Sequence, residues 1–263
     1  MQNSLLNLQR WLQISQVLKN QRERFSLEKG PPKYIMSSMR WMKQFDLFLL
    51  DLDGLLVDTE PLHFAAYQTL CKRHGYELPW NLQEYLGIAH ASSGGLQKAI
   101  HPHLGEESWN VLYQEKKRIY LELLHSGEIA LLPGVEAFLG ELLENRVKRC
   151  VATNSCKEQV ETIKDALPIL KTIPVWITRE DYENPKPAPD AYLKALELLA
   201  DPGDRMIGFE DSLRGIQALE RAGVLPVLIC DPAHSQLNEA LGVVHYPSFE
   251  QISDLNINHL HKK

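Results

Sequence analysis

Four short polar clusters along the chain combine the side-chain types that phosphate chemistry requires. Two are acidic, one supplies a hydroxyl and an amide, and one supplies a lysine: Asp51-Leu52-Asp53-Gly54, Glu210-Asp211-Ser212, Thr153-Asn154-Ser155 and Asn184-Pro185-Lys186-Pro187. Acids brought together repel one another unless cations hold them. Lys186 supplies one positive charge, and a hard divalent ion such as Mg²⁺, which prefers oxygen ligands, would supply the rest. A lysine, a hydroxyl and backbone N–H groups beside such an ion would form a phosphate cradle.

These clusters lie at or close after the ends of short apolar runs, which alternate with amphipathic stretches of helical length. The predicted strands are Phe45 to Leu50, Val147 to Thr153, Val175 to Thr178, Met206 to Glu210 and Val227 to Cys230. The predicted helices are Val135 to Asn145, Lys157 to Ala166, Ala188 to Leu199 and Ser212 to Ala222. This alternation predicts an α/β fold with a doubly wound parallel sheet. Ligands of such sheets bind outside the carboxyl ends of the strands, where the four clusters are expected.

The alternation is interrupted once, between the first and second predicted strands. Residues 61–131 contain helical patterns without a clear strand, at Pro61 to His74, Ser92 to Ile100 and Glu106 to His125. We therefore expect an inserted helical cap domain at 61–131, joined by two linkers to a core domain made of residues 44–60 and 132–263.

The run from Asp51 to Glu60 (DLDGLLVDTE) resembles the first motif of the haloacid dehalogenase superfamily. Thr153, Lys186 and Glu210-Asp211 resemble its second, third and fourth motifs, in the same order. The resemblance covers residues 45–250 and implies a Rossmann-like core. The helical insertion is similar to the cap of the subgroup that contains β-phosphoglucomutase and phosphoglycolate phosphatase.

The resemblance also implies a role for each motif residue. Asp51 would be the nucleophile that forms an aspartyl-phosphate, and Asp53 would act as general acid and then general base. The phosphate would be held by Thr153, Asn154 and Lys186. Mg²⁺ would be held by Asp51, Asp211, the backbone carbonyl of Asp53 and, directly or through a second-shell contact, Glu210.

Each motif also has an ordinary interpretation. Asp-x-Asp-Gly is often a turn, Thr153 could cap the helix that starts near Lys157, and Lys186 could be a solvated loop lysine. The cluster at 210–212 could cap the following helix. Four such coincidences, each at a predicted strand end, are far less expected than one active site.

The cap and its hinge leave more alternatives open. His63 would position or deprotonate groups near the nucleophile, or would be a surface residue of the hinge helix. His90 would be a weak phosphate clamp together with two serines. Four basic residues of the cap are predicted to lie on a solvated helical face, with contact between one of them and the substrate as the less favoured alternative: Lys98, Lys116, Lys117 and Arg118.

The same motif set serves phosphatases and phosphomutases. Asp53 disfavours dehalogenation, since a halide leaving group needs no proton. Mutases of this type grip the distal phosphate of the substrate with an arginine early in the cap, and Leu86 to Ser93 contain none. This favours a phosphatase acting on a sugar phosphate or phosphoglycolate-like compound, while Glu210-Asp211 and His63 favour a β-phosphoglucomutase-type enzyme. A partner-binding protein on a retired phosphatase fold is the third hypothesis.

Charge and composition limit the classes of molecule that the protein could bind. The chain of 263 residues carries a net charge of −6, yet residues 1–43 hold eight Lys/Arg against two Glu, so the remainder is strongly acidic. An acidic body argues against nucleic-acid binding. No stretch suits a membrane span, and four scattered cysteines suggest a reduced cytoplasmic compartment. The oligomeric state stays open.

The first 43 residues form a basic N-terminal extension, in which residues 4–19 have helical periodicity. This segment would be a docking or dimerisation arm or a targeting segment. Alternatively, the reading frame is assigned too long, and translation starts at Met36, Met39 or Met42.

Overall fold

The computed structural model describes residues 40–252 except 92, 93, 128, 233, 235, 236, 238, 239 and 241. The helix predicted at residues 4–19 therefore lies outside the described residues. None of the helices in the described ranges is long and apolar enough to cross a membrane.

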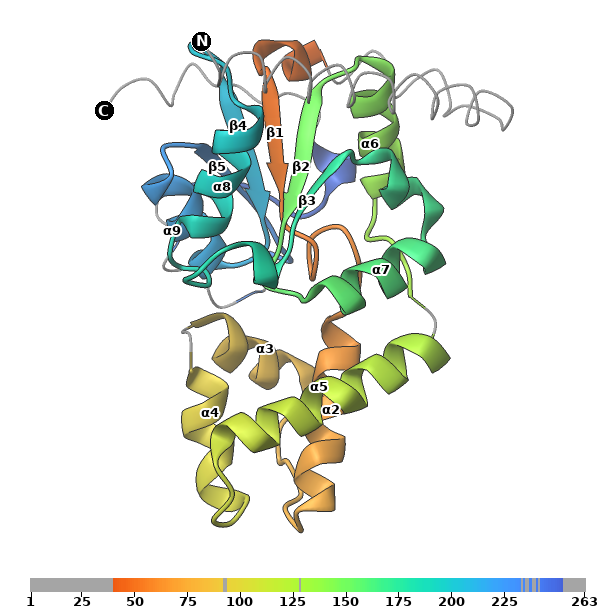
Figure 1. The fold of residues 1–263 in the computed structure, drawn as a ribbon, viewed down its shortest axis with the longest axis vertical. Helices are drawn as coiled ribbons and strands as arrows, with labels where there is room; N and C mark the ends of the chain where they lie inside the picture. The colour runs from red at the N-terminus through yellow and green to blue at the C-terminus, as the bar shows by residue number, and fades with distance from the viewer. Residues whose placement is uncertain are drawn as a thin grey trace.

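A six-stranded parallel sheet forms the centre of the molecule, in the order β3-β2-β1-β4-β5-β6 (Figure 1). The strands are β1 (Leu47–Leu50), β2 (Lys148–Ala152), β3 (Val175–Ile177), β4 (Met206–Glu210), β5 (Leu225–Ile229) and β6 (Val244–Tyr246). The predicted fold class is confirmed, and all five predicted strands are present. β6 was not predicted, because it is short and its residues are only half-buried at the edge of the sheet.

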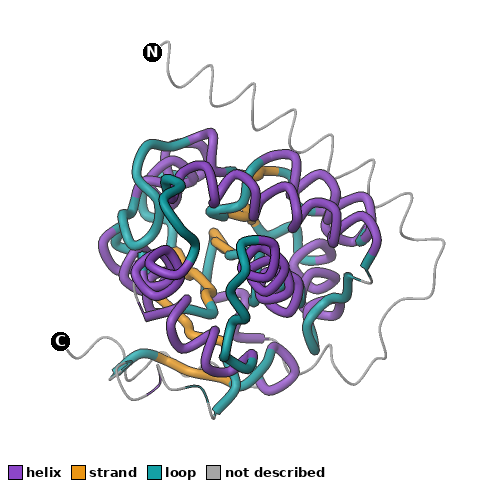
Figure 2. The backbone as a smooth tube through the Cα atoms, turned by 90° about the horizontal axis from the view of Figure 1, so that it is seen from below, coloured by secondary structure: helices purple, strands orange, loops and turns teal. Residues whose placement is uncertain are grey.

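Helices cover both faces of the sheet, as the doubly wound pattern requires. Side chains of β1 alternate between the faces: Phe48 and Leu50 pack in one core cluster, and Leu47 and Leu49 pack in the other. The first cluster is covered by α6 (Val135–Glu144) and α7 (Lys157–Ala166), and the second by α8 (Asp190–Leu199) and α9 (Leu213–Arg221). Seen from below, the sheet runs between helices, and part of it reaches the periphery of the molecule (Figure 2).

The insertion between β1 and β2 is helical and lies below the carboxyl ends of the strands in Figure 1. It comprises α2 (Glu60–Arg73), α3 (Leu82–Ala91), α4 (Gly95–Ile100) and α5 (Trp109–Ser126). We call these four helices the cap. Helices α4 and α5 each begin three residues later than predicted. Helix α3 was not predicted.

The N-terminal boundary of the packed core differs from the prediction. Residues Arg40–Gln44 form a 3₁₀ helix whose Trp41 and Met42 are buried with β1, α6 and β4. The Trp41 ring stacks on Phe138, with centroids 6.5 Å apart. Residues 41 and 42 therefore belong to the core rather than to the extension, and a chain that started at Met42 would lack a buried tryptophan.

Candidate active site

The topology brings three of the polar clusters to one place. β1 pairs with β2 on one side and with β4 on the other, so the residues that follow these three strands are neighbours. The chain winds from β1 outward through β2 and β3, and then returns to place β4 on the opposite side of β1. The crevice at such a reversal is where doubly wound folds bind ligands. Asp51 and Asp211 lie on its two sides.

Lys186 bridges the carboxylates of Asp51 and Glu210. Its Nζ contacts Asp51 Oδ1, Glu210 Oε1 at 2.6 Å and the Ala152 carbonyl oxygen at 2.7 Å. Glu210 Oε1 also accepts a hydrogen bond from the Tyr192 hydroxyl. Burial alone would lower the pKa of Lys186, but the Asp51 and Glu210 charges hold it above its ordinary value. The lysine is thus a permanent buried cation, which contradicts the alternative of a solvated loop lysine.

Asp51, Glu210 and Asp211 form an all-oxygen group that fits a hard cation. All three are buried, and one ligand atom from each lies within 4.8 Å of the others. Burial raises the pKa of each carboxyl, because one lysine does not offset three negative charges in a desolvated site. A divalent ion would supply the missing charge, and Mg²⁺ accepts such a carboxylate set.

Two glycines make room for these acids. Gly54 has φ +76°, and a Cβ there would lie 2.3 Å from Asp211 Oδ2. A Cβ at Gly215 would lie 1.8 Å from Glu210 Cδ. The glycine of the first motif therefore serves both the turn and the close approach of a metal-binding candidate.

Asp53 lies in a different environment, formed by hydroxyl groups. Its Oδ1 accepts a 2.6 Å hydrogen bond from Thr59 Oγ1, and its Oδ2 accepts one of 2.6 Å from Ser155 Oγ and a longer one, 3.4 Å, from Thr153 Oγ1. Burial would raise the pKa of Asp53, but His63 and these hydroxyls together hold it well below its ordinary value. Asp53 is ionised here and is held at both carboxylate oxygens. Sequence reasoning assigned no role to Thr59 or Ser155.

The cap contacts Asp53 through His63 on α2. His63 Nε2 lies 3.6 Å from Asp53 Oδ1, and the imidazole stacks on Tyr120 of α5, with centroids 3.9 Å apart. Lys116 Nζ lies 2.6 Å from His63 Nδ1. Lys116 is buried, so the prediction that it lies on a solvated face is wrong. Burial lowers the pKa of this lysine to about 7.

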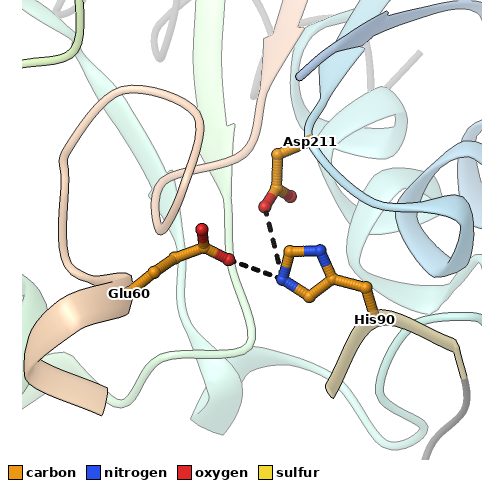
Figure 3. Close-up of side chains that lie close together, drawn as sticks. All are labelled: Glu60, His90 and Asp211. Atoms are coloured by element: carbon orange, nitrogen blue, oxygen red, sulfur yellow. Dashed lines mark ion pairs between the residues drawn. The ribbon is translucent and has the colours of Figure 1, made fainter. Parts of the chain in front are cut away.

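His90 bridges the cap and the core (Figure 3). From the end of α3, its Nε2 lies 2.5 Å from Glu60 Oε1 and 3.8 Å from Asp211 Oδ2. Burial would lower the pKa of His90, but the hydrogen bond to Glu60 and the Asp211 charge raise it. The imidazole also stacks on His234. The side chain predicted as a phosphate clamp is therefore held by two carboxylates, and the serines expected beside it lie outside the described residues.

A family model of haloacid dehalogenase-like hydrolases matches residues 48–229, most of the chain. The chain belongs to this family.

Curated relatives agree with this membership. Protein CbbY of Rhodobacter capsulatus is 28% identical over 188 residues, covering 68% of this chain and 83% of the relative. The phosphorylated carbohydrates phosphatase of Thermotoga maritima is 30% identical over 179 residues, with coverage of 67% and 81%. The probable pseudouridine-5'-phosphatase of Drosophila melanogaster is 30% identical over 195 residues, with coverage of 72% and 83%.

Solved structures extend the similarity to the fold. CbbY from Rhodobacter sphaeroides, crystallised with phosphate, has a TM-score of 0.68 and 26% identity, and the match covers 80% of this chain and 97% of that one. A putative β-phosphoglucomutase from Thermotoga maritima has a TM-score of 0.58 and 27% identity, with coverage of 79% and 96%. The predicted superfamily and the prediction of a hydrolytic enzyme are confirmed.

In this haloacid dehalogenase-like chain, the second motif presents its polar atoms beside Asp51 and Asp53. Thr153 Oγ1 accepts from the Ser155 backbone N–H at 3.0 Å, while α7 takes Cys156 as its N-cap, so capping is not the role of Thr153. Asn154 Oδ1 accepts from the Lys186 backbone N–H at 3.3 Å, which orients its side-chain amide. By contrast, Ser212 does cap α9, accepting from Gly215 N–H.

A cavity of about 460 Å³ lies between the cap and these motifs. Its floor is formed by the family motifs, including Asp51, Asp53, Thr153 and Lys186, and its cap side by aromatic residues such as Tyr67, Tyr85 and Trp109. The volume suits a small metabolite. The site is thus a mixed aromatic and charged chamber with its acids at one end.

Proposed function

We propose that this hydrolase is a Mg²⁺-dependent phosphatase that cleaves small phosphomonoesters through an aspartyl-phosphate on Asp51. The observation that carries the proposal is the contrast between two aspartates two residues apart. Asp51 lies against Lys186 in the group suited to a divalent ion, whereas Asp53 is held by hydroxyls and His63. One carboxylate is placed for attack and the other for proton transfer.

Asp51 attacks the phosphorus atom, and the bond from phosphorus to the ester oxygen breaks. The bound Mg²⁺, held by Asp51, Glu210 and Asp211, would supply positive charge to the phosphate oxygens. Lys186 keeps its proton and stabilises negative charge on the same group. Thr153 and Asn154 donate hydrogen bonds to the remaining oxygens, as their position beside Asp51 allows.

Asp53 gives a proton to the leaving ester oxygen, later takes one from the attacking water, and then returns that proton through His63 to Lys116, so each group ends the turnover as it began. Because its pKa is held low, it must first receive a proton. The contact from Lys116 Nζ to His63 Nδ1, and from His63 Nε2 to Asp53 Oδ1, offers a route for that proton. Lys116, with its pKa lowered to about 7, can donate near neutral pH.

The substrate class is a sugar phosphate or a similar small acid phosphate. The volume of the cavity, about 460 Å³, supports a small substrate, and the relatives include proteins named phosphorylated carbohydrates phosphatase and hexitol phosphatase A. The alternative is a β-phosphoglucomutase-type mutase, which uses the same core residues and is favoured by the engagement of His63 with Asp53. The cap segment at residues 86–93 holds no arginine, which favours the phosphatase.

The test is release of inorganic phosphate from a panel of sugar and small-acid phosphates with Mg²⁺. Release that disappears in Asp51→Asn and in excess EDTA supports the proposal, provided that the variant melts like the wild type. Conversion of β-glucose 1-phosphate to the 6-phosphate without phosphate release would replace the phosphatase by the mutase. Inactivity of folded protein in both assays would favour a partner-binding role on a retired phosphatase fold.

A further inference from the structure

Arg214 is a cation in the substrate cavity that has no hydrogen-bonding or ion-pair partner in the described part of the chain. It lines the cavity from the second position of α9, three residues after Asp211. Its Nε is buried and makes no hydrogen bond, and no ion pair or other hydrogen bond of the Arg214 side chain occurs among residues that the structure describes. The residue as a whole is half-buried, so its charged end remains available to a ligand in the cavity.

The other strong cations of the cavity are engaged. Arg179 donates to the Tyr182 and Glu183 carbonyl oxygens at 2.8 and 2.9 Å. Three more basic groups have partners already described: Lys186 with Asp51 and Glu210, His90 with Glu60, and Lys116 with His63. Lys117 also lines the cavity, and its Nζ lies over the Tyr113 ring, 5.1 Å from the centroid. Arg214 and Lys117 thus leave positive charge available in one enclosed space.

Without a bound ligand, the position of Arg214 does not favour the stability of the folded protein. Leaving the buried Nε–H of Arg214 without an acceptor costs free energy. The first turn of a helix is also the positive end of its dipole, where a cation is disfavoured. Neither packing nor helix stability explains an arginine at this position, whereas an anion bound beside it would offset both costs.

Arg214 lines the same cavity as three tyrosines of the cap. Burial raises the pKa of the Tyr67, Tyr85 and Tyr113 hydroxyls, and the charge of Arg214 opposes this rise in all three. These tyrosines come from three different cap helices, and α3 packs against α9 across the domain boundary. A ligand held by Arg214 would therefore lie under the cap, in the same cavity as Asp51.

We propose that Arg214, assisted by Lys117, binds a second anionic group of the substrate, remote from the phosphoryl group that reacts at Asp51. The fork of an arginine matches an oxyanion with two parallel hydrogen bonds, and phosphate and carboxylate both fit. The core helix α9 would then supply the arginine that the cap segment at 86–93 lacks. The preferred substrates would be sugar bisphosphates or phosphorylated sugar acids. A similar structure, CbbY of Rhodobacter sphaeroides, was crystallised with xylulose-(1,5)bisphosphate.

This inference rests on the proposed phosphatase function, and kinetics on matched substrates tests it. Glucose 6-phosphate carries one anionic group, 6-phosphogluconate adds a carboxylate and glucose 1,6-bisphosphate adds a phosphate; ribose 5-phosphate and ribose 1,5-bisphosphate cover a shorter span. We expect kcat/KM at least about tenfold higher for a doubly anionic compound than for its singly anionic match. An advantage for the bisphosphates alone identifies phosphate as the ligand, and an advantage that includes 6-phosphogluconate identifies any oxyanion.

In Arg214→Gln, this advantage should fall about 10- to 100-fold, mainly through KM, while kcat/KM for glucose 6-phosphate stays within about twofold. Arg214→Lys should retain part of the advantage for doubly anionic substrates. Arg118 is an exposed arginine of the cap, so Arg118→Gln should retain all of this advantage. Equal kcat/KM across the wild-type series, or an equal loss on every substrate in Arg214→Gln, would overturn the inference.

Binding separates this inference from the proposed function. Calorimetry of Asp51→Asn with glucose 1,6-bisphosphate and glucose 6-phosphate, with and without Arg214→Gln, measures the second anion site without turnover. Hydrolysis of glucose 6-phosphate with no preference for a second anion in either assay would sink the Arg214 site alone. Absence of hydrolysis together with Arg214-dependent binding of the bisphosphate would sink the phosphatase and keep the site.

Discussion

Replacing Lys116 by methionine should stabilise the folded protein at neutral pH and impair its activity. Lys116 is 4% exposed, and burial lowers its pKa from 10.5 to about 7. That change corresponds to a penalty on the order of 4 to 5 kcal/mol for the charged form in the folded state. Methionine keeps an apolar stem and removes the ionisable group, whose Nζ lies 4.9 Å from the Tyr67 ring centroid and 4.8 Å from that of Tyr120. Subtracting the lost contact with His63, we expect a gain of roughly 2 to 3 kcal/mol at pH 7.

The gain should depend on pH with a definite sign. Between pH 7 and 10.5 the unfolded chain holds a proton on Lys116 that the folded chain has released, so wild-type stability from this group rises with pH. Below pH 7 both states are protonated and the full penalty is present. The advantage of Lys116→Met over wild type should therefore be largest at pH 7 and below, and should shrink to a small fraction of that value by pH 10.

Urea unfolding of both proteins at these two pH values measures the difference, with Lys98→Met as the control. Lys98 is an exposed lysine of the cap, so its replacement should change stability by less than about 0.5 kcal/mol at either pH. Phosphatase assays should show lower kcat for Lys116→Met, because His63 loses its partner at Nδ1. A variant that is less stable than wild type at pH 7, or whose advantage does not change with pH, would refute the assignment of Lys116 as a buried, strained cation.

Three further substitutions test the core and the metal-binding group. Trp41→Ala, which removes a buried ring from contact with Phe138, should cost about 3 to 5 kcal/mol in urea unfolding; a change below about 1 kcal/mol would place residue 41 outside the core. Gly215→Ala should lower the affinity for Mg²⁺ and destabilise the folded protein by about 1 to 3 kcal/mol, because the alanine Cβ would overlap Glu210. An unaltered Mg²⁺ titration would contradict the close contact between Gly215 and Glu210. Tyr192→Phe removes a donor to Glu210 and should cost about 1 to 3 kcal/mol in thermal or urea unfolding; unchanged stability would contradict a stabilising role for this hydrogen bond.

The sheet and its strand-end chemistry were predictable because both depend on local sequence. A buried parallel strand is a short apolar run, and the polar residues directly after it must lie at the carboxyl edge. Asp51, Thr153 and Asp211 follow from this rule alone. The helix α3 escaped prediction, since Gly87 in its middle lowers the intrinsic helix propensity by about 1 kcal/mol and its stability comes from packing of residues such as Tyr85.

The cap side of the site depends on contacts between residues far apart in the chain. Lysine is almost never buried unless it is paired, so a solvated face was the ordinary expectation for Lys116. Its partner His63 is 53 residues away, and no local pattern links the two. Ser155 could have been found, because it follows Thr153 at the spacing of Asp51 and Asp53 and shares their strand-end position. Arg214 shows no signal in the sequence beyond its place after the fourth motif.

The separation of the two aspartates between core and cap has a consequence for water. The partners of Asp51 come from the core, through Lys186 and Ala152. Asp53, in contrast, also faces the cap residues His63 and Tyr120. Under the proposed mechanism, a movement of the cap would leave Asp51 and Lys186 assembled but would remove His63 from Asp53. The proposed proton transfer by Asp53 would then require the same cap position that limits how much water reaches the site, which would link substrate enclosure to the second half-reaction.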